Sequence, residues 1–508
     1  MTIREELDSM QQEASARIPQ EVLSFFSKPG GHSLIIRGEA GTGKTTLSLQ
    51  LIEELAQYNN SHYLSTRVSD ILLLVQFPWL GEKIYGKEYT SFVKNQVPWI
   101  TGEGDPDTAH VIPRDDGAHD VGLKKLMDIY HDERRLGADD FPAMEDVNRV
   151  YDAVKGALPQ RSLVVIDSLD ALAERHGLEN APFITAIQKD LVEGYGANII
   201  FVFENNEKEY DYLADGSVVL SSQEHQGRTI RHLKVQKLRG CEIKQFRYLF
   251  TLKGGRVQSF GNIKTLDVTP DREWSSLTDS RGKISSGLVD LDRLLGGGFN
   301  PGAAVLYEIG KNVPMEIISL MEQSLVANFA SQRRGALWLP MKRVSADTVK
   351  KQLSAAIHPN LFDKCIRIPE LAAQSEAGRS NHVLRVEGAD VAADLKWDLL
   401  TYSLKSADMP YLTLFGFDTL ESIYGENVMS GLTEHIATLK QNGGVFAAFS
   451  SESTQSNKKL IDLSTVHLKI ERIDGVLTLY GEEPFTECNA VTLEWRERGG
   501  CLSLTPVV

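Results

Sequence analysis

The sequence predicts an α/β protein with two tandem domains, each built on a mainly parallel β-sheet. Its 508 residues exceed what one hydrophobic core ordinarily organises, so two or three domains are expected. Short apolar runs alternate with amphipathic stretches, a pattern typical of buried parallel strands joined by helices. The same succession of patterns begins again near Ile284, which indicates an internal repeat.

Five apolar runs predict the buried strands of the two halves. They are residues 33–36, 162–167 and 198–203 in the first half, and residues 303–308 and 412–418 in the second. A helix pattern with Leu47, Leu51 and Leu55 on one face follows the first run. An Arg-Val-Ser phrase follows a strand in each half, at 67–69 and again at 343–345, and supports the repeat.

Changes in composition along the chain predict the domain boundaries. We expect a helical lead-in at 1–18, a first domain at 19–262, a linker at 263–283 and a second domain at 284–508. The linker is polar and contains Pro270 among many Ser, Thr and Asp residues. Another polar stretch, at 102–140, is rich in Asp, Gly and His, and we interpret it as a surface insertion in the first domain.

Composition and charge narrow the functional classes. Hydrophobic residues make up 42% and charged residues 24% of the chain, as in soluble globular proteins. No apolar run approaches the ~20 residues of a membrane-spanning helix, and residues 1–7 do not resemble a signal peptide. The four cysteines are scattered, so we expect a reducing, cytoplasmic setting without a zinc site or disulfides. The net charge of −15 disfavours constitutive DNA binding.

Residues 38–45 match the P-loop (Walker A) pattern G-x-x-x-x-G-K-[ST] at every fixed position. Its glycines let the backbone curl so that N–H groups converge on phosphate oxygens, and the following helix adds partial positive charge. We expect Lys44 to reach the β- and γ-phosphates of ATP, and the Thr45 hydroxyl to ligate Mg²⁺. The predicted nucleotide-binding residues are Gly38, Glu39, Ala40, Gly41, Thr42, Gly43, Lys44, Thr45 and Thr46.

Carboxylates are predicted at the ends of two neighbouring strands. A P-loop needs an acid that holds the water shell of the metal, and Asp167, which ends the run 162–167, is predicted to be this residue. We interpret Asp170, further along, as a solvated residue at the start of a helix. Glu204, which follows the run 198–203, is the candidate for the base that activates the attacking water.

The second half is expected to have lost this chemistry. Aligning the strands puts residues 310–317 on the eight P-loop positions, and only the first glycine is kept. In this alignment Met315 replaces the glycine before the lysine, Glu316 replaces the lysine, and Ile317 offers no hydroxyl to a metal. A carboxylate in the place of the lysine repels phosphate. We interpret the second half as a degenerate copy, and Asp418 as a relic of the metal-binding aspartate.

The residues also carry a resemblance to a known family. Residues 286–302 resemble the opening of KaiC-like domains in the RecA superfamily of ATPases, and Lys-Leu-Arg-Gly at 237–240 is similar to a segment of the same domains. The layout, with its degenerate second P-loop and Ser-Thr-Arg-Val-Ser at 65–69, looks closest to the archaeal GvpD-like branch, whose members regulate gas vesicle gene expression. The resemblance covers nearly all of the chain after residue 18. It implies two tandem RecA/KaiC-like P-loop domains, the second degenerate.

The resemblance also implies roles for individual residues. It places nucleotide contacts on the P-loop and Asp167, and a contact with the nucleotide of a neighbouring subunit on Lys237 and Arg239. A homo-oligomer, either a ring or a dimer, is therefore expected. KaiC-like proteins usually carry two glutamates after the second strand to activate water, and here Arg67 and Val68 take their place. Hydrolysis is accordingly expected to be slow.

These observations favour an ATP-dependent regulatory ATPase, whose nucleotide state changes its conformation or assembly and is read by a protein partner, as in the control of gas vesicle genes. Two alternatives stay open. One is a RecA-like DNA-dependent ATPase of recombination or repair, and the other is a nucleotide-sensing scaffold without significant hydrolysis. The DNA alternative depends on the basic stretch 228–247, where the acidity of the whole chain favours a subunit or protein contact instead.

Overall fold

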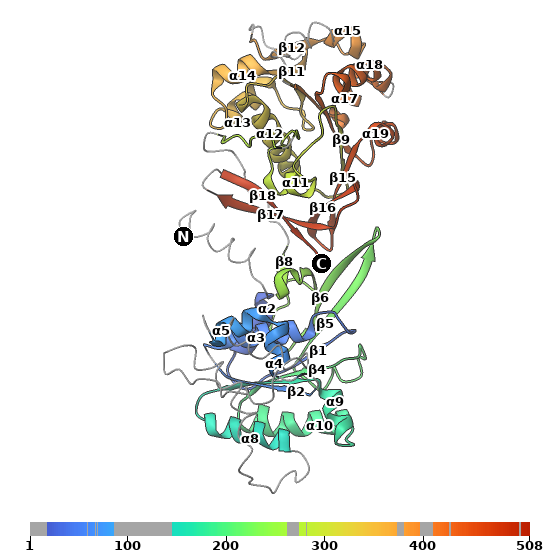
Figure 1. The fold of residues 1–508 in the computed structure, drawn as a ribbon. Coiled ribbons are helices and arrows are strands. Elements are labelled where there is room, and N and C mark those ends of the chain that lie inside the picture. Colours follow the sequence, from blue (N-terminus) through green and yellow to red (C-terminus); the bar gives the residue numbers. More distant parts are fainter. Residues whose placement is uncertain are drawn as a thin grey trace, which may run out of the picture. The chain divides into compact units, whose positions relative to one another are not determined.

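The computed structural model describes residues 18–57, 59–66, 68, 70–85, 145–261, 274–280, 282–372, 380–396, 410–425, 428–496 and 499–508. These residues form two compact units, the first ending at Phe260 and the second beginning at Gly261 (Figure 1). The expected insertion at 102–140, nearly all of the lead-in at 1–18 and much of the linker at 263–283 lie outside the described residues.

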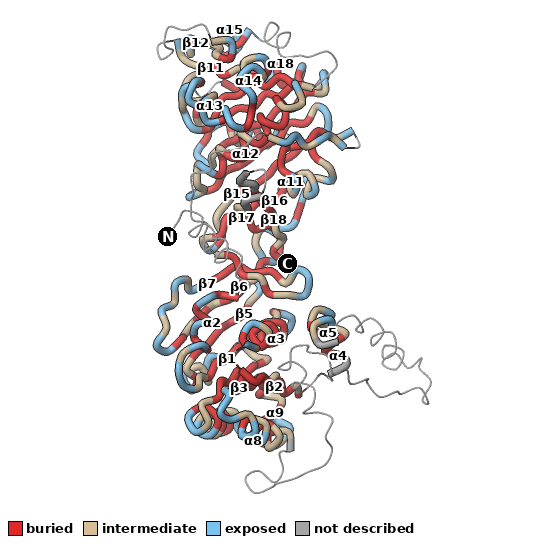
Figure 2. The backbone as a smooth tube through the Cα atoms, turned by 90° about the vertical axis from the view of Figure 1, so that its left-hand side faces the viewer, coloured by how far each residue is buried: buried red, intermediate tan, exposed pale blue. Residues whose placement is uncertain are grey.

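The first unit contains an eight-stranded sheet in the order β2-β3-β4-β1-β5-β6-β7-β8. Its strands are β1 Ser33–Arg37, β2 Asn60–Ser65, β3 Ser162–Asp167, β4 Asn198–Val202, β5 Gly216–His225, β6 Arg228–Leu238, β7 Arg247–Thr251 and β8 Gln258–Phe260. The strands from β2 to β5 in this order pair in parallel, and β6 to β8 continue the sheet by antiparallel pairing. β1 is buried throughout, as a parallel strand covered on both faces must be (Figure 2).

Helices cover both faces of this sheet. One face packs against α2 Gln20–Ser27, α3 Lys44–Leu55, α4 Asp70–Gln76 and α5 Pro78–Tyr85. The other packs against α8 Glu145–Ala157, α9 Leu169–Arg175, α10 Asn180–Ile187 and the π-helical turn Gln188–Gly194. Each helix buries an apolar face against the sheet, and the resulting layers form two hydrophobic clusters.

The second unit contains a ten-stranded sheet in the order β12-β11-β10-β13-β14-β9-β15-β16-β17-β18. Its strands are β9 Ala304–Ile309, β10 Ala336–Leu339, β11 Ile366–Leu371, β12 Val383–Val386, β13 Leu412–Gly416, β14 Val445–Ser451, β15 Val466–Ile473, β16 Val476–Glu483, β17 Asn489–Arg496 and β18 Gly499–Pro506. Its helices are α11 Val289–Leu294, α12 Met315–Ser331, α13 Ala346–Leu353 and α14 Pro359–Cys365 on one face, and α15 Val391–Leu395, α17 Phe417–Tyr424, α18 Val428–Gln441 and α19 Asn457–Leu463 on the other.

The two sheets repeat the same strand order. The order β10-β13-β14-β9-β15-β16-β17-β18 matches β2-β3-β4-β1-β5-β6-β7-β8 strand for strand, and β11 and β12 extend the second sheet at its parallel edge. The predicted fold class, two tandem α/β domains with mainly parallel sheets, is therefore confirmed.

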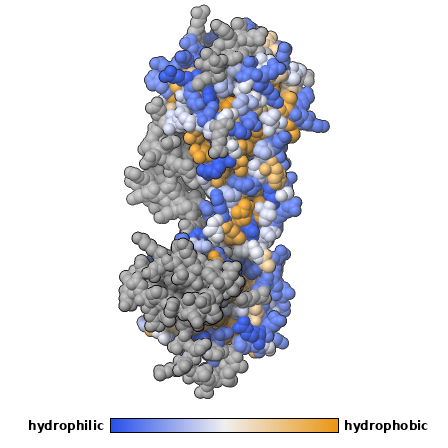
Figure 3. Space-filling model, in the orientation of Figure 1, coloured by the Kyte–Doolittle hydropathy of each residue, from blue (hydrophilic) through white to orange (hydrophobic). Residues whose placement is uncertain are grey.

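No helix that the structure describes is long and apolar enough to cross a bilayer. On the face drawn in Figure 3, hydrophobic residues occur in small groups among hydrophilic ones.

One buried acid in the second unit lies within a helix. Glu322 of α12 is 1% exposed, and its Oε1 accepts a hydrogen bond from the backbone N of Met341 at 2.8 Å. Burial raises the pKa of Glu322 to about 8, because a charged carboxylate has no water there. The unfolded chain therefore releases this proton near the ordinary pKa of 4.5, whereas the folded unit keeps it until about pH 8.

We predict that Glu322→Gln becomes progressively more stable than the wild type as the pH rises from about 5 to about 8. Below the unfolded pKa both states hold the proton, so the difference between the two proteins is then independent of pH. Calorimetric melting temperatures of both proteins across this range test the prediction. A difference that stays constant with pH would contradict it.

Candidate nucleotide-binding site

The P-loop lies at the carboxyl edge of the first sheet, between β1 and α3. Gly38, Gly41 and Gly43 have positive φ angles of 152°, 75° and 98°. A Cβ on Gly38 would lie 2.2 Å from the carbonyl oxygen of Leu220, so this position accepts only glycine. The loop therefore has the curled backbone that the motif predicts, at the edge where ligands of open α/β sheets bind.

Lys44 is folded back over the loop that precedes it. Its Nζ donates to the carbonyl oxygens of Gly38 at 2.6 Å and Glu39 at 2.8 Å, and the residue is 9% exposed. Burial lowers the pKa of Lys44, and the charges of Asp167, Glu204 and Asp170 partly offset this effect. Three carboxylates therefore lie near enough to act on the ammonium group.

Asp167 and Thr45 are brought together, as the sequence predicts. The Thr45 hydroxyl donates to Oδ2 of Asp167 at 2.7 Å. The Tyr63 hydroxyl, on β2, donates to the same oxygen at 2.7 Å. Sequence reasoning missed Tyr63, because its place beside Asp167 depends on the pairing of β2 with β3. Tyr63 fixes one carboxylate oxygen and thereby the orientation of the acid.

Glu204 follows β4 and lies beside the start of α9. Its backbone N donates to Oδ2 of Asp170 at 3.0 Å, and its Oε1 lies 3.5 Å from the Ser168 hydroxyl. Asp170 is in the first turn of α9, as expected, and is partly buried. Its carboxylate accepts the hydrogen bond from the backbone N of Glu204. Asp170 therefore keeps partial contact with solvent, and the pairing of β3 with β4 gives it a backbone partner that the sequence did not indicate.

The donor set at this edge fits Mg²⁺. Mg²⁺ prefers oxygen ligands and usually combines one or two protein groups with phosphate oxygens and water. Thr45 Oγ1 and Asp167 Oδ2 are such oxygens, and their contact shows that one ion can reach both. Among the described residues no group of three or more His, Cys, Asp or Glu side chains is arranged to hold a metal by itself.

Arg231 adds a cation to the loop that the sequence did not assign. It lies on β6, opposite Ser222 of β5, and its Nη1 donates to the carbonyl oxygen of Gly41 at 3.0 Å. Its Nε is buried and makes no hydrogen bond within the described structure. The sequence showed only a basic stretch, since the contact depends on the register of the β5–β6 hairpin.

Lys237 and Arg239 are not near the P-loop of their own chain. Leu238 pairs with Gly216, and Gly216 pairs with Leu34, so β6 ends beside the start of β1, whereas the P-loop follows its end. Lys237 Nζ donates to the carbonyl oxygen of Ala214 at 2.6 Å. Arg239 Nη1 contacts Oδ1 of Asp215 at 2.8 Å, although its side chain is 66% exposed.

The second unit places different residues at the P-loop positions. Ile36 packs against α3, which begins at Lys44, and Tyr307 packs against α12, which begins at Met315. The number of residues from Ile36 to Lys44 equals the number from Tyr307 to Met315. Residues 309–316 therefore correspond to 38–45, and the alignment expected from the sequence, 310–317, was wrong by one residue. The expected alignment placed Gly310 on Gly38, whereas the alternation of side chains along the strand fixes the correct register. Met315 stands in the place of Lys44.

The corrected alignment leaves the second loop without phosphate-binding features. Glu316 takes the place of Thr45, and Pro314, which has no N–H, takes the place of Gly43. Within 309–316 only Asn312 has a positive φ, compared with three glycines in the first loop. The loop therefore lacks both the lysine and the curled backbone, as the interpretation of a degenerate copy requires.

Asp418 is not the counterpart of Asp167. Val202 pairs with both Ile36 and Asp167, and Phe449 pairs with both Tyr307 and Gly416. Gly416 therefore takes the place of Asp167.

The interpretation of Asp418 as a relic was wrong because the sequence does not show this register. A Cβ on Gly416 would lie 2.3 Å from Cα of Met341, so no carboxylate fits there. The carboxylate of Asp418 instead accepts hydrogen bonds from the backbone N and hydroxyl of Ser451, at 3.3 and 3.0 Å.

The strand order, the glycine loop after β1 and the acid after β3 define the class: a P-loop protein with tandem RecA-type domains, of which the first has a complete phosphate loop. Family profiles agree. The profile described as "GvpD gas vesicle protein, P-loop domain" matches residues 22–236, and "GvpD basic region 2" matches residues 273–378.

Individual relatives support the same family. The chain is 24% identical to protein GvpD2 of Halobacterium salinarum over 497 residues, covering 93% of each chain. It is 21% identical to protein GvpD1 of the same organism, covering 96% of each. It is also 25% identical over 290 residues to the circadian clock oscillator protein KaiC of Synechococcus elongatus, covering 56% of this chain and 49% of KaiC. The chain is therefore a GvpD-like P-loop protein of the KaiC/RecA type.

We predict that Lys44→Ala weakens ATP binding at least ~10-fold, because a hydrogen bond to a charged group contributes about 1.5–3 kcal/mol. Glu316→Ala, at the corresponding loop of the second unit, should change the affinity by less than ~2-fold, within the usual effect of a surface substitution. Titration of both variants with a fluorescent ATP analogue measures the dissociation constants. Equal losses in the two variants would contradict the asymmetry of the two units.

Proposed function

We propose that the first unit binds ATP with Mg²⁺ and hydrolyses it slowly, and that the nucleotide state controls a conformation or assembly that a regulatory protein partner reads. The observation that carries this proposal is the complete P-loop whose Thr45 contacts Asp167. From the matches to the GvpD gas vesicle profile and to GvpD1 and GvpD2, we further propose that the partner acts in the regulation of gas vesicle genes, in the cytoplasm.

The roles of the residues follow from where they lie. Residues 38–46 hold the triphosphate by backbone N–H groups, and Lys44 turns from the loop carbonyls to the β- and γ-phosphates. Thr45 and Asp167 hold Mg²⁺, which neutralises charge on the phosphates when bound. Tyr63 keeps the Asp167 carboxylate oriented.

The base is the least usual part of the site. Arg67, which takes a place where KaiC-like proteins hold glutamates, lies outside the described residues. We assign the role of water-orienting base to Glu204, whose charge acts on Lys44 and whose backbone is held by Asp170. A single carboxylate at the end of β4, in place of a glutamate pair at the end of β2, is consistent with slow turnover.

Assembly explains the place of Lys237 and Arg239. Both lie away from the P-loop of their own chain, and Arg239 is largely exposed, so a neighbouring subunit can receive it. The similarity to KaiC supports a homo-oligomer. A cationic finger supplied by a neighbour can accelerate phosphoryl transfer by about 10³–10⁵-fold.

The DNA-dependent alternative has less support. The basic residues at 228–247 that suggested it have partners within the chain: Arg231 contacts the P-loop, and Arg239 pairs with Asp215. The formal net charge is −15. These contacts favour a nucleotide-linked or subunit-linked role for the stretch over phosphate-backbone binding.

We predict that mixing Arg239→Ala chains with Lys44→Ala chains recovers phosphate release that neither variant shows alone. In mixed assemblies an intact P-loop from the first variant faces an intact Arg239 from the second. Steady-state phosphate release is measured at a fixed total concentration, and light scattering confirms that the mixture assembles. An assembled mixture without recovery would contradict the role in trans.

We predict a turnover well below ~10 s⁻¹, the pace of a median enzyme, and a further loss in Glu204→Gln within the ~10²–10⁴-fold range of general base catalysis. Phosphate release by the wild type, Glu204→Gln and Lys44→Ala is compared under one set of conditions. Turnover well above that pace would show that a fully competent base exists and that Arg67 does not mark its loss. Wild-type release no higher than that of Lys44→Ala would instead indicate a nucleotide sensor without hydrolysis.

A further inference from the structure

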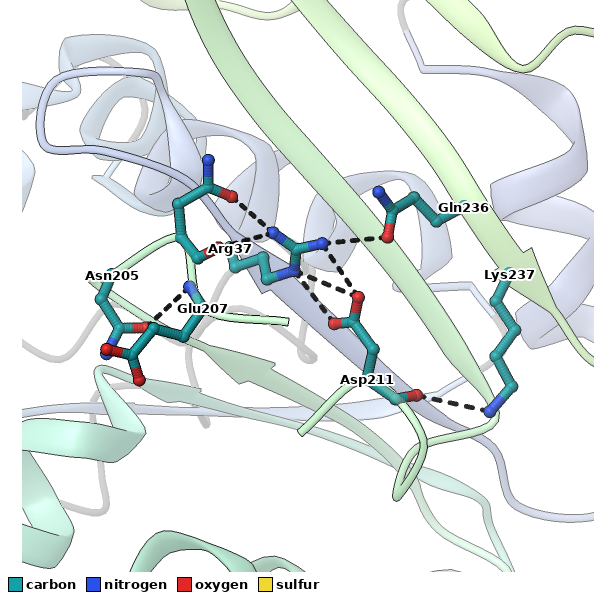
Figure 4. Close-up of polar contacts among 7 residues, drawn as sticks. Arg37, Asn205, Glu207, Asp211, Gln236 and Lys237 are labelled. Carbon is teal, nitrogen blue, oxygen red and sulfur yellow. Dashed lines mark hydrogen bonds and ion pairs between the residues drawn. The ribbon is translucent and has the colours of Figure 1, made fainter. Parts of the chain in front are cut away.

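Arg37 is a buried cation directly before the P-loop. It is the last residue of β1 and is 1% exposed (Figure 4). Its Nε lies 3.0 and 3.2 Å from the two carboxylate oxygens of Asp211, and its Nη2 lies 2.9 Å from one of them. Nη2 also donates to Gln236 at 2.9 Å, and Nη1 to the carbonyl oxygen of Asn206 at 3.0 Å. A buried guanidinium is tolerated because all of its nitrogens are bonded.

The segment that Asp211 belongs to joins several functional groups. Residues 205–215 follow Glu204 directly and lead into β5. The Asp211 carbonyl oxygen lies 3.4 Å from Lys237 Nζ, and Figure 4 shows Asp211 between Arg37 and Lys237. At its other end Asp215 accepts hydrogen bonds from Ser33 at the start of β1 and pairs with Arg239. The segment is thus bound to both ends of the P-loop strand.

The second unit shows that the fold itself does not require arginine at this position. In the register established above, Glu308 of β9 corresponds to Arg37 of β1. Glu308 is also buried, but it bonds His467 of β15 at 2.8 Å and Asn457 at 3.4 Å. Arginine occurs in the unit that has a complete P-loop, and a carboxylate occurs in the unit that lacks one.

We propose that the Arg37–Asp211 ion pair is a positioning device. It fixes the segment 205–215 on the P-loop strand, so that Glu204, which precedes the segment, and Lys237, which contacts it, keep the places that hydrolysis needs. The inference rests on the proposed hydrolysis and adds two positioning residues to the same site. A displacement of about 1 Å far from the reacting atoms can cost 10²-fold in rate, so loss of the pair affects turnover more than binding.

The test compares two substitutions that remove the same charge. Asp211→Asn keeps the shape and one acceptor oxygen but removes the charge. Glu53→Gln does the same in the ion pair of Glu53 with Arg256, where the two guanidinium nitrogens lie 2.8 and 3.2 Å from the carboxylate. That pair joins α3 to the segment before β8. We measure the dissociation constant of the ATP analogue, the turnover and the melting temperature.

We expect both variants to melt earlier, and only Asp211→Asn to lose turnover, by ~10–100-fold, with nucleotide affinity within ~3-fold of the wild type. Arg37→Lys keeps the charge but loses the planar fork, whose separate nitrogens reach Asp211, Gln236 and Asn206 at once. It should lose turnover in the same way, and serves if Asp211→Asn does not fold. Equal turnover in Asp211→Asn and Glu53→Gln would overturn the proposal. It would leave the Arg37–Asp211 ion pair with a role in stability alone.

A second readout does not depend on hydrolysis. Acetic anhydride labels exposed lysine amines, and mass spectrometry compares Lys237 with the exposed Lys253. Release of the segment in Asp211→Asn should raise the labelling of Lys237 relative to Lys253 several-fold, by removing its carbonyl partners. If the wild type releases no phosphate above Lys44→Ala, the proposed hydrolysis fails. Unchanged labelling of Lys237 then overturns the positioning role as well, and increased labelling supports the positioning of Lys237.

Discussion

The parallel register of β3, β4 and β1 is the constraint on which the site depends. Val202 of β4 pairs with Asp167 on one side and Ile36 on the other, so the acid and the P-loop are brought to one edge of the sheet. The two segments are far apart in sequence, and only this pairing lets Thr45 reach Asp167. The same pairing brings Asp170 to the backbone of Glu204. The pairing of these strands thus sets the positions from which Asp167, Asp170 and Glu204 approach Lys44.

The two units differ in what occupies equivalent positions of one strand order. In the first unit the P-loop strand ends in Arg37, and glycines open the loop to phosphate. In the second, Gly416 leaves no room for an acid, and Met315 stands where the first unit has Lys44. The second sheet keeps its packing and gains β11 and β12 at its edge. The packing of the sheet is therefore separable from the phosphate loop. The second unit has kept the packing and lacks the features of a phosphate loop.

Local patterns made part of this structure predictable. The P-loop is a contiguous motif, and Asp167 ends an apolar run, so both could be found without knowing the strand order. The fold class followed from the alternation of apolar runs and helices. The absence of a Walker A lysine from the second half was also visible, since no lysine follows its first strand at the required spacing.

Contacts that depend on register could not be predicted. Tyr63 and Arg231 reach the site through strand pairing, and Asp211 reaches Arg37 through the segment 205–215. No local signal in the sequence marks these contacts. Unknown strand register also explains the one-residue error in the alignment of the second loop and the wrong role for Asp418. A glycine and an aspartate present in both halves suggested equivalent positions, and the pairing of β13, β14 and β9 does not support them.

One P-loop per chain should bind one nucleotide per chain. Isothermal titration of the full chain with a non-hydrolysable ATP analogue and Mg²⁺ measures this number, because the stoichiometry counts sites without depending on hydrolysis. We expect about one nucleotide per chain. Two sites of similar affinity would show that the second unit is not degenerate, and the absence of binding would contradict the proposed site.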